Sequence, residues 1–247
     1  MPPEHPPVRQ GEARREELIR AAIEVFGEAG FAGGRIDEVA RRVGIRRPSV
    51  LYHFPDKQAL YFASISDVVH DISDRILATE DQPGERLEAI SDTWVDFVID
   101  RPNAARLLLR QMIDAAPLPQ LSSDLDRNTD LPVGKLFASI QAAIDEQTAP
   151  DSVKTLDASE FSLILSSTSL VWVAGRSAVK GALGFDTLAP QSIQRHRRTL
   201  RSLVRQLLIA SHDAAIAPVS EPESPTDPMR RTIAETDEII PSSKRST

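Results

Sequence analysis

The sequence predicts an all-α protein with a small N-terminal three-helix domain and a larger C-terminal helical domain. Along most of the chain, apolar residues recur at intervals of three and four, as they do on one face of an α-helix. No stretch alternates apolar and polar residues between hairpin turn signals, which argues against a β-sheet. We place the first domain at residues 12–60 and the second at residues 61–214. Residues 215–247 are rich in proline and polar residues, and we expect them to be mostly disordered.

Glycine and proline mark the ends of the helices that we expect in the first part of the chain. Gly30 and Gly44 are helix stop signals, because glycine readily adopts the left-handed conformation that ends a helix. Pro48 and Pro55 suit the first turn of a helix, where the missing N–H would be unpaired in any case. The expected helices cover residues 12–29, 37–42, a short stretch at Pro48, and 55–76.

Longer helices follow in the second domain. The expected ranges are 87–97, 102–112, 134–147, 161–179 and 191–212. Residues 161–179 are apolar nearly all round, which predicts one buried helix. In the last helix a leucine-rich stripe lies opposite Arg198, Arg201 and Arg205, which we expect on a solvated face.

Composition limits the compartment and the partners. The net charge is −7, but residues 9–57 carry +2 and the rest of the chain carries −9, so the N-terminal domain would face phosphate. There is no cysteine, and hence no disulfide framework or thiolate metal site. The N-terminus lacks the apolar core of a signal peptide, and no charge-free apolar run reaches the roughly 20 residues of a membrane span. We therefore expect a cytoplasmic protein without a membrane partner.

The segment RIDEVARRVGIRRPSVLYHFPDK, residues 35–57, predicts two short helices joined by a tight turn at Gly44. This is the pattern of a helix-turn-helix, whose second helix lies in the major groove of DNA with its N-terminal residues against the base edges. That N-terminus comprises Arg46, Arg47, Pro48 and Ser49. Since arginine pairs with guanine through two hydrogen bonds or grips phosphate, the segment indicates a DNA-binding surface.

Three polar side chains further along are candidate phosphate contacts. Tyr52 and His53, at the far end of the second helix, can donate to phosphate oxygens. Lys57 adds a cation near the positive N-terminus of the next helix. Tyr52 is alternatively a core aromatic and His53 an ordinary surface histidine, whereas Phe54 is expected in the core.

From Arg14 to Leu60 the sequence resembles the N-terminal domain of the TetR family of regulators. The matching stretches are LIRAAIEVFGEAGF, IDEVARRVGI and RPSVLYHFPDKQAL, in this order and at the family's spacing. The resemblance ends near the fourth helix. It implies a ligand-responsive transcriptional regulator, most often a repressor, that binds double-stranded operator DNA. The residues that the resemblance implies as DNA contacts are Arg47, Ser49, Tyr52, His53 and Lys57.

Two positions depart from the family pattern. Arg35 stands where the family usually has Ser or Thr, so the helix loses its N-cap, although Arg35 can still reach phosphate. Leu51 stands where the family usually has Tyr, and it can meet a thymine methyl group but cannot hydrogen-bond a phosphate. Tyr52 is placed to take over part of that role.

The second domain should bind the effector. Large apolar side chains lie on the inward stripes of its helices, and each can be explained as core packing. If the protein is ligand-gated, some of them should line an apolar cavity, because such sites are concave and largely apolar. The candidate pocket residues are Trp94, Phe97, Met112, Phe137 and Trp172. Few charges fall on these stripes, so we expect a small hydrophobic effector.

A homodimer on a palindromic operator is also expected. One recognition helix buries too little surface for a specific site, whereas a symmetric dimer reads two half-sites about one turn apart. The two last long helices, paired with their symmetry mates, would form a four-helix bundle. The candidate interface residues are Trp172, Leu200, Leu203, Val204 and Leu207.

An enzyme is not expected. The sequence has no Gly-rich phosphate loop, His-Glu-x-x-His or nucleophile elbow, so we assign no catalytic residue, cofactor or metal. Asp67, His70 and Asp71 have helical spacing, but metal sites in helical bundles usually use two Glu-x-x-His copies, which favours a solvated His70. Two alternatives stay open. One is a helical interaction protein whose helix-turn-helix no longer reads DNA, suggested by the departures at Arg35 and Leu51. The other is an all-helical enzyme with its site around His70.

Overall fold

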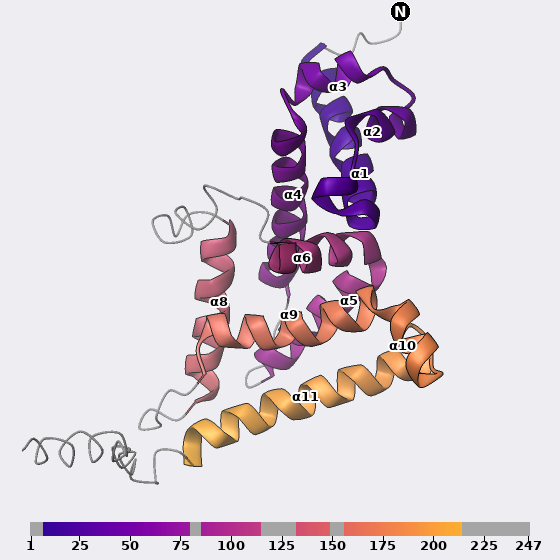
Figure 1. Ribbon diagram of the computed structural model, residues 1–247. Helices are drawn as coiled ribbons and strands as arrows, with labels where there is room; N and C mark the ends of the chain where they lie inside the picture. The colour runs from indigo at the N-terminus through magenta and orange to yellow at the C-terminus, as the bar shows by residue number, and fades with distance from the viewer. Residues whose placement is uncertain (1–6, 80–84, 115–131, 149–155, 214–247) are drawn as a thin grey trace, which may run out of the picture. The chain divides into compact units, whose positions relative to one another are not determined.

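The computed structural model describes residues 7–79, 85–114, 132–148 and 156–213, which form ten α-helices and no strand (Figure 1). This confirms the predicted all-α class. The prediction of disorder in residues 215–247 lies outside the described residues. The helices are α1 (Pro7–Gly33), α2 (Ile36–Val43), α3 (Arg47–His53), α4 (Lys57–Leu77), α5 (Arg86–Asp100), α6 (Pro102–Asp114), α8 (Pro132–Gln147), α9 (Ala158–Ala174), α10 (Arg176–Leu183) and α11 (Pro190–Asp213).

The first helix is longer than its apolar pattern predicts. It begins at Pro7 and continues past Gly30 to Gly33, with a kink at Gly30, where φ is 71° and ψ is 176°. Glycine tolerates this positive φ because it has no Cβ. The predicted stop at Gly30 is therefore a kink.

Two caps set the bounds of the segment that holds α2 and α3. Gly44 ends α2 in the left-handed conformation, with φ 72°. The side chain of Asp56 begins α4 by accepting a hydrogen bond from the N–H of Ala59 at 2.7 Å. An N-cap of this kind contributes about 1 kcal/mol, and it places the first turn of α4 directly after the helix-turn-helix.

The apolar run at residues 161–179 is divided between two helices. α9 and α10 bend by 72° at their junction, where a Cβ on Gly175 would lie only 2.6 Å from the carbonyl oxygen of Val171. The expectation of one fully buried helix is wrong, because Leu163 and Val171 of α9 are 58% and 52% exposed. Among the described helices none could by itself cross a membrane; only the bent pair of α9 and α10, taken together, has the length and composition for it.

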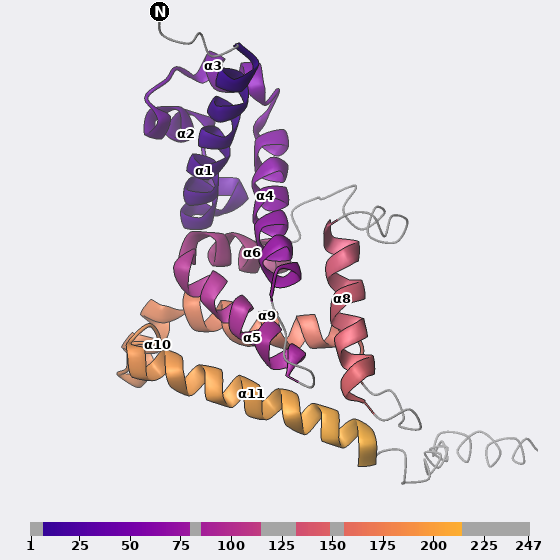
Figure 2. The same cartoon turned by 180° about the vertical axis from the view of Figure 1, so that it is seen from behind.

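One apolar core extends from α1 to α11, and its largest fully buried side chains include Phe26, Phe97 and Phe161. Burying a side chain of this size contributes about 1.5–3 kcal/mol. Figures 1 and 2 show α6 crossing the end of α1, α8 beside α4, and α11 running along α5. α1, α4 and α6 thus connect the helix-turn-helix to the rest of the core.

The basic face of α11 is not simply solvated. Arg201 Nε donates to Asp92 at 3.1 Å, and Arg205 Nε donates to Glu88 at 3.0 Å. Both arginines are exposed, as expected, but each is also paired, because α5 presents carboxylates along the edge where α11 packs. Arg198 is exposed.

Candidate DNA interface and ligand cavity

The recognition helix α3 is anchored at one end and open at the other. Val50 is fully buried and Phe54 is 3% exposed, so both hold α3 against the core. The open end follows Arg46, the N-cap, which has extended backbone and no side-chain cap. The exposed side chains at this end are Arg46, Arg47, Pro48 and Ser49. The arrangement leaves both arginines accessible to a groove or to phosphates.

The aromatic residues near the end of α3 have different environments. Tyr52 is 87% exposed, which excludes the core alternative. Its ring lies edge-on to that of His53 at 5.3 Å. Phe54 is in the core as predicted, with the guanidinium of Arg15 5.1 Å from its ring centre. Leu51 is half-buried and packs on the core, so only part of it is open to a thymine methyl group.

Arg47 is paired in the free protein. Its Nη1 donates to Asp37 Oδ2 at 2.9 Å, which joins α3 to the start of α2. Both side chains are about half exposed, at 54% and 55%. Such surface pairs contribute only about 0–1 kcal/mol. DNA can therefore replace Asp37 as the partner of Arg47 at low cost.

Two other basic candidates, Arg35 and Lys57, differ in whether their side chains are engaged within the protein. Arg35 is exposed at the N-cap of α2 and makes no side-chain cap bond. Lys57 Nζ donates to the carbonyl oxygen of Ala32 at 3.1 Å and lies 4.8 Å from the ring centre of Phe31. Lys57 therefore also holds the kinked end of α1 next to α4.

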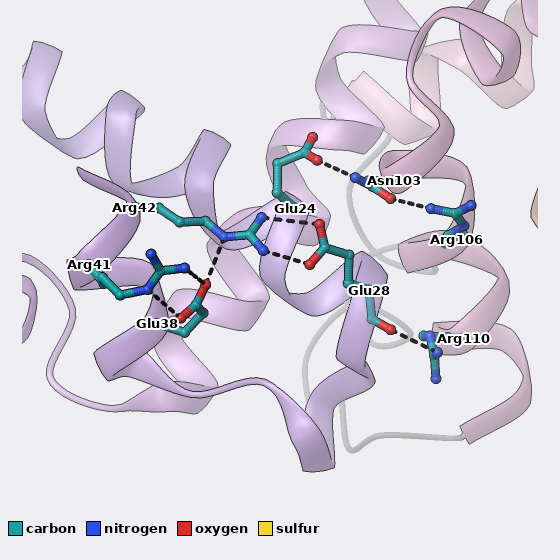
Figure 3. Close-up of polar contacts among 8 residues, drawn as sticks. All are labelled: Glu24, Glu28, Glu38, Arg41, Arg42, Asn103, Arg106 and Arg110. Carbon is teal, nitrogen blue, oxygen red and sulfur yellow. Dashed lines mark hydrogen bonds and ion pairs between the residues drawn. The ribbon is translucent and has the colours of Figure 1, made fainter. Parts of the chain in front are cut away.

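A polar clamp joins α1 to α2 (Figure 3). Arg42 donates to both carboxylate oxygens of Glu28, at 2.6 and 3.2 Å, and to Glu38 at 3.1 Å. Arg41 donates to Glu38 at 2.6 and 2.9 Å. Hydrogen bonds from Arg41 and then Arg42 lower the pKa of Glu38 to about 2, and the bond from Arg42 lowers the pKa of Glu28. The clamp is therefore fully ionised at neutral pH.

The opposite side of α1 is fastened to α6. Asn103 donates to Glu24 and accepts from Arg106 at 2.7 Å, while Arg110 donates to the backbone oxygen of Glu28 at 3.2 Å (Figure 3). A Cβ on Gly27 would lie 2.4 Å from the backbone oxygen of Asn103, so the two helices meet almost backbone to backbone. This junction was not predicted from the sequence. Gly27, an isolated glycine inside a helical pattern, was the available signal.

An apolar cavity of about 250 Å³ lies between α4, α5, α6, α8 and α9. Its lining residues are Ile65, Val69, Ile72, Ile76, Ile90, Trp94, Leu108, Gln111, Met112, Val133, Leu136, Phe137, Ile140, Ser162, Leu165, Ser166 and Leu170. Three of the five candidate pocket residues, Trp94, Met112 and Phe137, are among them. Phe97 and Trp172 lie outside this lining.

Phe97 and Trp172 are occupied elsewhere. Phe97 is fully buried, with the guanidinium groups of Arg75 and Arg101 at 5.4 and 5.7 Å from its ring centre. Trp172 Nε1 donates to the backbone oxygen of Thr187 at 2.9 Å. Periodicity predicts which face of a helix points inward, but it does not predict which inward side chains leave a gap.

Comparisons with known proteins agree with this architecture. The family model for bacterial regulatory proteins of the tetR family matches residues 18–64. The HTH-type transcriptional regulator RutR of Escherichia coli is 31% identical over 144 residues, which span 55% of this chain and 68% of RutR. The chain belongs to the TetR family.

Further TetR-family relatives act in both directions. FasR of Mycolicibacterium smegmatis, an HTH-type transcriptional activator, is 28% identical over 128 residues, 50% of this chain and 57% of FasR. IcaR of Staphylococcus aureus, a negative transcriptional regulator of a biofilm operon, is 26% identical over 86 residues, 35% of this chain and 46% of IcaR. These relatives are transcriptional regulators, and this TetR-family chain is a transcriptional regulator and not an enzyme.

Solved structures show the same fold. A TetR-family regulator from Marinobacter aquaeolei has a TM-score of 0.58 at 15% identity, covering 79% of this chain and 97% of its own. AibR, solved with isovaleryl coenzyme A and operator DNA, has a TM-score of 0.56 at 15% identity, covering 77% and 97%. At this identity the likeness establishes the TetR fold alone.

The interface candidates of this TetR-family protein occupy two environments. Leu200 and Val204 are only 3% and 4% exposed within the single chain, because α11 packs them against α5. Leu203, Leu207 and Trp172 are half-buried. Leu163 and Val171 of α9, which were not among the interface candidates, are more exposed.

The neighbourhood of His70 is engaged within the protein. Asp71 accepts from Arg75 Nε at 2.8 Å and also from Arg101. His70 Nδ1 lies 3.1 Å from the backbone oxygen of Ser66. Within the described ranges of the chain, no group of three or more metal-binding side chains comes together.

A buried histidine links α9 to α11. The ring of His196 stacks on Trp172 at 4.5 Å, and its Nε2 lies 3.3 Å from Ser169 Oγ. Burial, reinforced by the neighbouring charge of Arg197, lowers the pKa of His196 to about 4. The imidazole is therefore neutral at physiological pH.

This histidine should make stability depend on pH. In the unfolded chain His196 takes up a proton near pH 6.5, whereas in the folded chain it resists protonation until about pH 4. The stability that this neutral histidine contributes is thus fully present above pH 6.5. The free energy of unfolding should fall by roughly 2–3 kcal/mol as the pH drops to 4. Urea unfolding across this range should show a flatter pH slope for His196→Gln than for the unchanged protein. The exposed His70→Gln is the matched control, and an unchanged slope in His196→Gln would contradict the assignment.

Proposed function

We propose that this regulator binds a palindromic operator as a homodimer, represses transcription in the cytoplasm, and releases DNA when a small hydrophobic effector enters the apolar cavity. The observation that carries DNA binding is the anchoring of α3. Val50 and Phe54 fix the helix in the core, while Arg46, Arg47 and Ser49 stay exposed at its N-terminus. This is the end that a helix-turn-helix presents to base edges.

The outward face of α9 supports the dimer. Leu163, Ser167 and Val171 follow one another at intervals of four residues, and all three are exposed. Side chains spaced by four residues form a ridge that can pack into a groove on a second helix. α9 and α11 with their symmetry mates would then form a four-helix bundle. In this arrangement α9 contributes most of the apolar contact.

The cavity supports ligand control, because two of its walls are also parts of the route to the DNA-binding head. α4 begins next to α3 and carries Ile65, Val69, Ile72 and Ile76 into the cavity lining. α6 lines the cavity with Leu108 and Met112 and is fastened to α1 through Asn103 and Arg110. α1 in turn holds α2 through Glu28 and Arg42.

Ligand binding acts through this route by a shift in population. A ligand that favours one position of α4 and α6 also favours one position of the head attached to them. DNA is released only if that position differs from the one that the operator requires. By reciprocity, operator DNA must weaken ligand binding by the same factor. AibR, solved with both an acyl coenzyme A and operator DNA, shares this fold.

Operator binding tests the proposal. Duplexes selected from a random-sequence pool should be palindromic, and their affinity should fall steeply with salt because phosphate contacts release counterions. Arg47→Ala should weaken binding to the selected duplex by about 1–3 kcal/mol and relax the preference at one base position. Arg176→Ala on α10 removes an exposed arginine from the body and is the matched control. If no duplex is selected and binding shows no salt dependence, a helical interaction protein is the better assignment.

A further inference from the structure

Two polar atoms at the ligand cavity have no hydrogen-bond partner. Trp94 and Ser162 both line the cavity, and Trp94 is only 8% exposed. Trp94 Nε1 and Ser162 Oγ are buried, and neither meets a partner among the described residues. Buried polar groups are nearly always paired, so two orphaned atoms at one cavity call for a common explanation.

The indole N–H of the second tryptophan, the half-buried Trp172, has a hydrogen-bond partner. Trp172 Nε1 donates to the backbone oxygen of Thr187 at 2.9 Å. Gln111, another polar residue of the lining, accepts a hydrogen bond from Tyr61 at 3.0 Å. Among the described lining residues, the buried polar atoms without a partner are Trp94 Nε1 and Ser162 Oγ.

The remaining wall is apolar and uncharged. None of the described residues that line the cavity carries a charge. A carboxylate or phosphate in this space would lose its water without meeting a cation, which is strongly unfavourable. A neutral acceptor would instead find the N–H of Trp94, and the hydroxyl of Ser162 can donate as well.

We infer that the effector is a compact, uncharged molecule with an apolar body and one or two carbonyl-type oxygens, held by hydrogen bonds from Trp94 Nε1 and Ser162 Oγ. The inference rests on the proposed ligand control and specifies the ligand class for the same cavity. A volume of about 250 Å³ lies just below the roughly 300–1,000 Å³ of pockets that hold drug-sized ligands, which favours a small body.

Three probes of equal heavy-atom number separate the possibilities. Acetophenone has a ketone oxygen, α-methylstyrene replaces that oxygen with a methylene group, and benzoate is charged at neutral pH. Each is titrated by calorimetry into the full-length protein and into Trp94→Phe and Ser162→Ala, which remove one donor each and keep most of the side-chain volume.

The expected pattern compares each probe with itself across the variants. Acetophenone should lose three- to tenfold in affinity in either variant, because one hydrogen bond is lost. α-Methylstyrene should change less than about twofold, since it cannot accept the bond. Benzoate should bind at least about tenfold more weakly than acetophenone to the unchanged protein, because its charge has no partner.

The indole N–H signals give a second readout. In a proton–nitrogen correlation spectrum, acetophenone should shift the Trp94 indole signal, identified by its absence in Trp94→Phe. The Trp172 signal is the internal control, because its N–H is already bonded to Thr187.

Different failures have different meanings. If the probes bind but acetophenone is as insensitive to the two variants as α-methylstyrene, or if benzoate binds most tightly, the ligand class is wrong and ligand control still stands. If none of the probes binds or shifts any signal, both the ligand class and the cavity's role in ligand control are overturned. Neither result affects DNA binding, which the operator selection measures separately.

Discussion

Replacing Leu163 and Val171 together with glutamate should convert the protein to a monomer and lower its operator affinity at least about a hundredfold. Both side chains are more than half exposed in the single chain, so the substitutions should leave the fold intact. In the proposed bundle they would bury carboxylates without partners, which is costly. A dimer gains a factor of about 10²–10⁴ in affinity by linking two DNA-binding domains, and the monomer loses this gain.

Sedimentation and operator titration measure the two effects. Leu77→Glu is the matched control, since Leu77 is an exposed leucine, at 41%, on a different helix, the end of α4. It should remain dimeric and bind the operator normally. A Leu163→Glu/Val171→Glu variant that sediments as a dimer would move the interface elsewhere. Leu203 and Leu207 are less suitable targets, because they are half-buried in the chain and glutamate there would also test folding.

Gly27→Ala should destabilise the protein by about 1–3 kcal/mol, the usual cost of overpacking a tight contact. The new Cβ would lie 2.4 Å from the backbone oxygen of Asn103, and a backbone atom cannot move aside as a flexible side chain can. Alanine also improves helix propensity by about 0.5–1 kcal/mol, which is too small to offset the clash. α1 and α6 must therefore separate.

Thermal unfolding should show this loss as a decrease of several °C in Tm, at about 2–4 °C per kcal/mol for a domain of this size. Operator affinity should fall as well, because the displaced α1 carries α2 through Glu28 and Arg42. Gly11→Ala is the matched control in the same helix, since a Cβ there meets nothing within 4 Å. Equal stability of the two variants would show that the close approach of α1 and α6 is unimportant.

The helix-turn-helix could be predicted from the sequence because its signals are local. Gly44 marks the end of one helix, and Pro48 marks the first turn of the next. These two signals also place Arg46 and Arg47 at the start of the second helix. Its buried anchors, Val50 and Phe54, lie within the same short segment. The family resemblance covers this part of the chain, as does the match at residues 18–64.

The cavity was only partly predictable. The apolar stripes indicated that Trp94, Met112 and Phe137 point inward, and all three line the cavity. The same stripes predicted Phe97 and Trp172 as pocket residues equally well, although both side chains make their contacts elsewhere. Whether an inward side chain faces a gap or a neighbour depends on the angle at which helices from distant parts of the chain cross.

The sequence by itself determined the helical class, the position of the helix-turn-helix and the residues at the exposed N-terminus of α3. These features depend on contacts within a few residues. Tertiary structure alone decided which charges pair and where the helices meet. Arg201 and Arg205 bind carboxylates about a hundred residues away, and Gly27 meets the backbone of Asn103 on another helix. Helical periodicity determines on which side of its helix a side chain lies. The partner that the side chain meets there is determined by long-range packing.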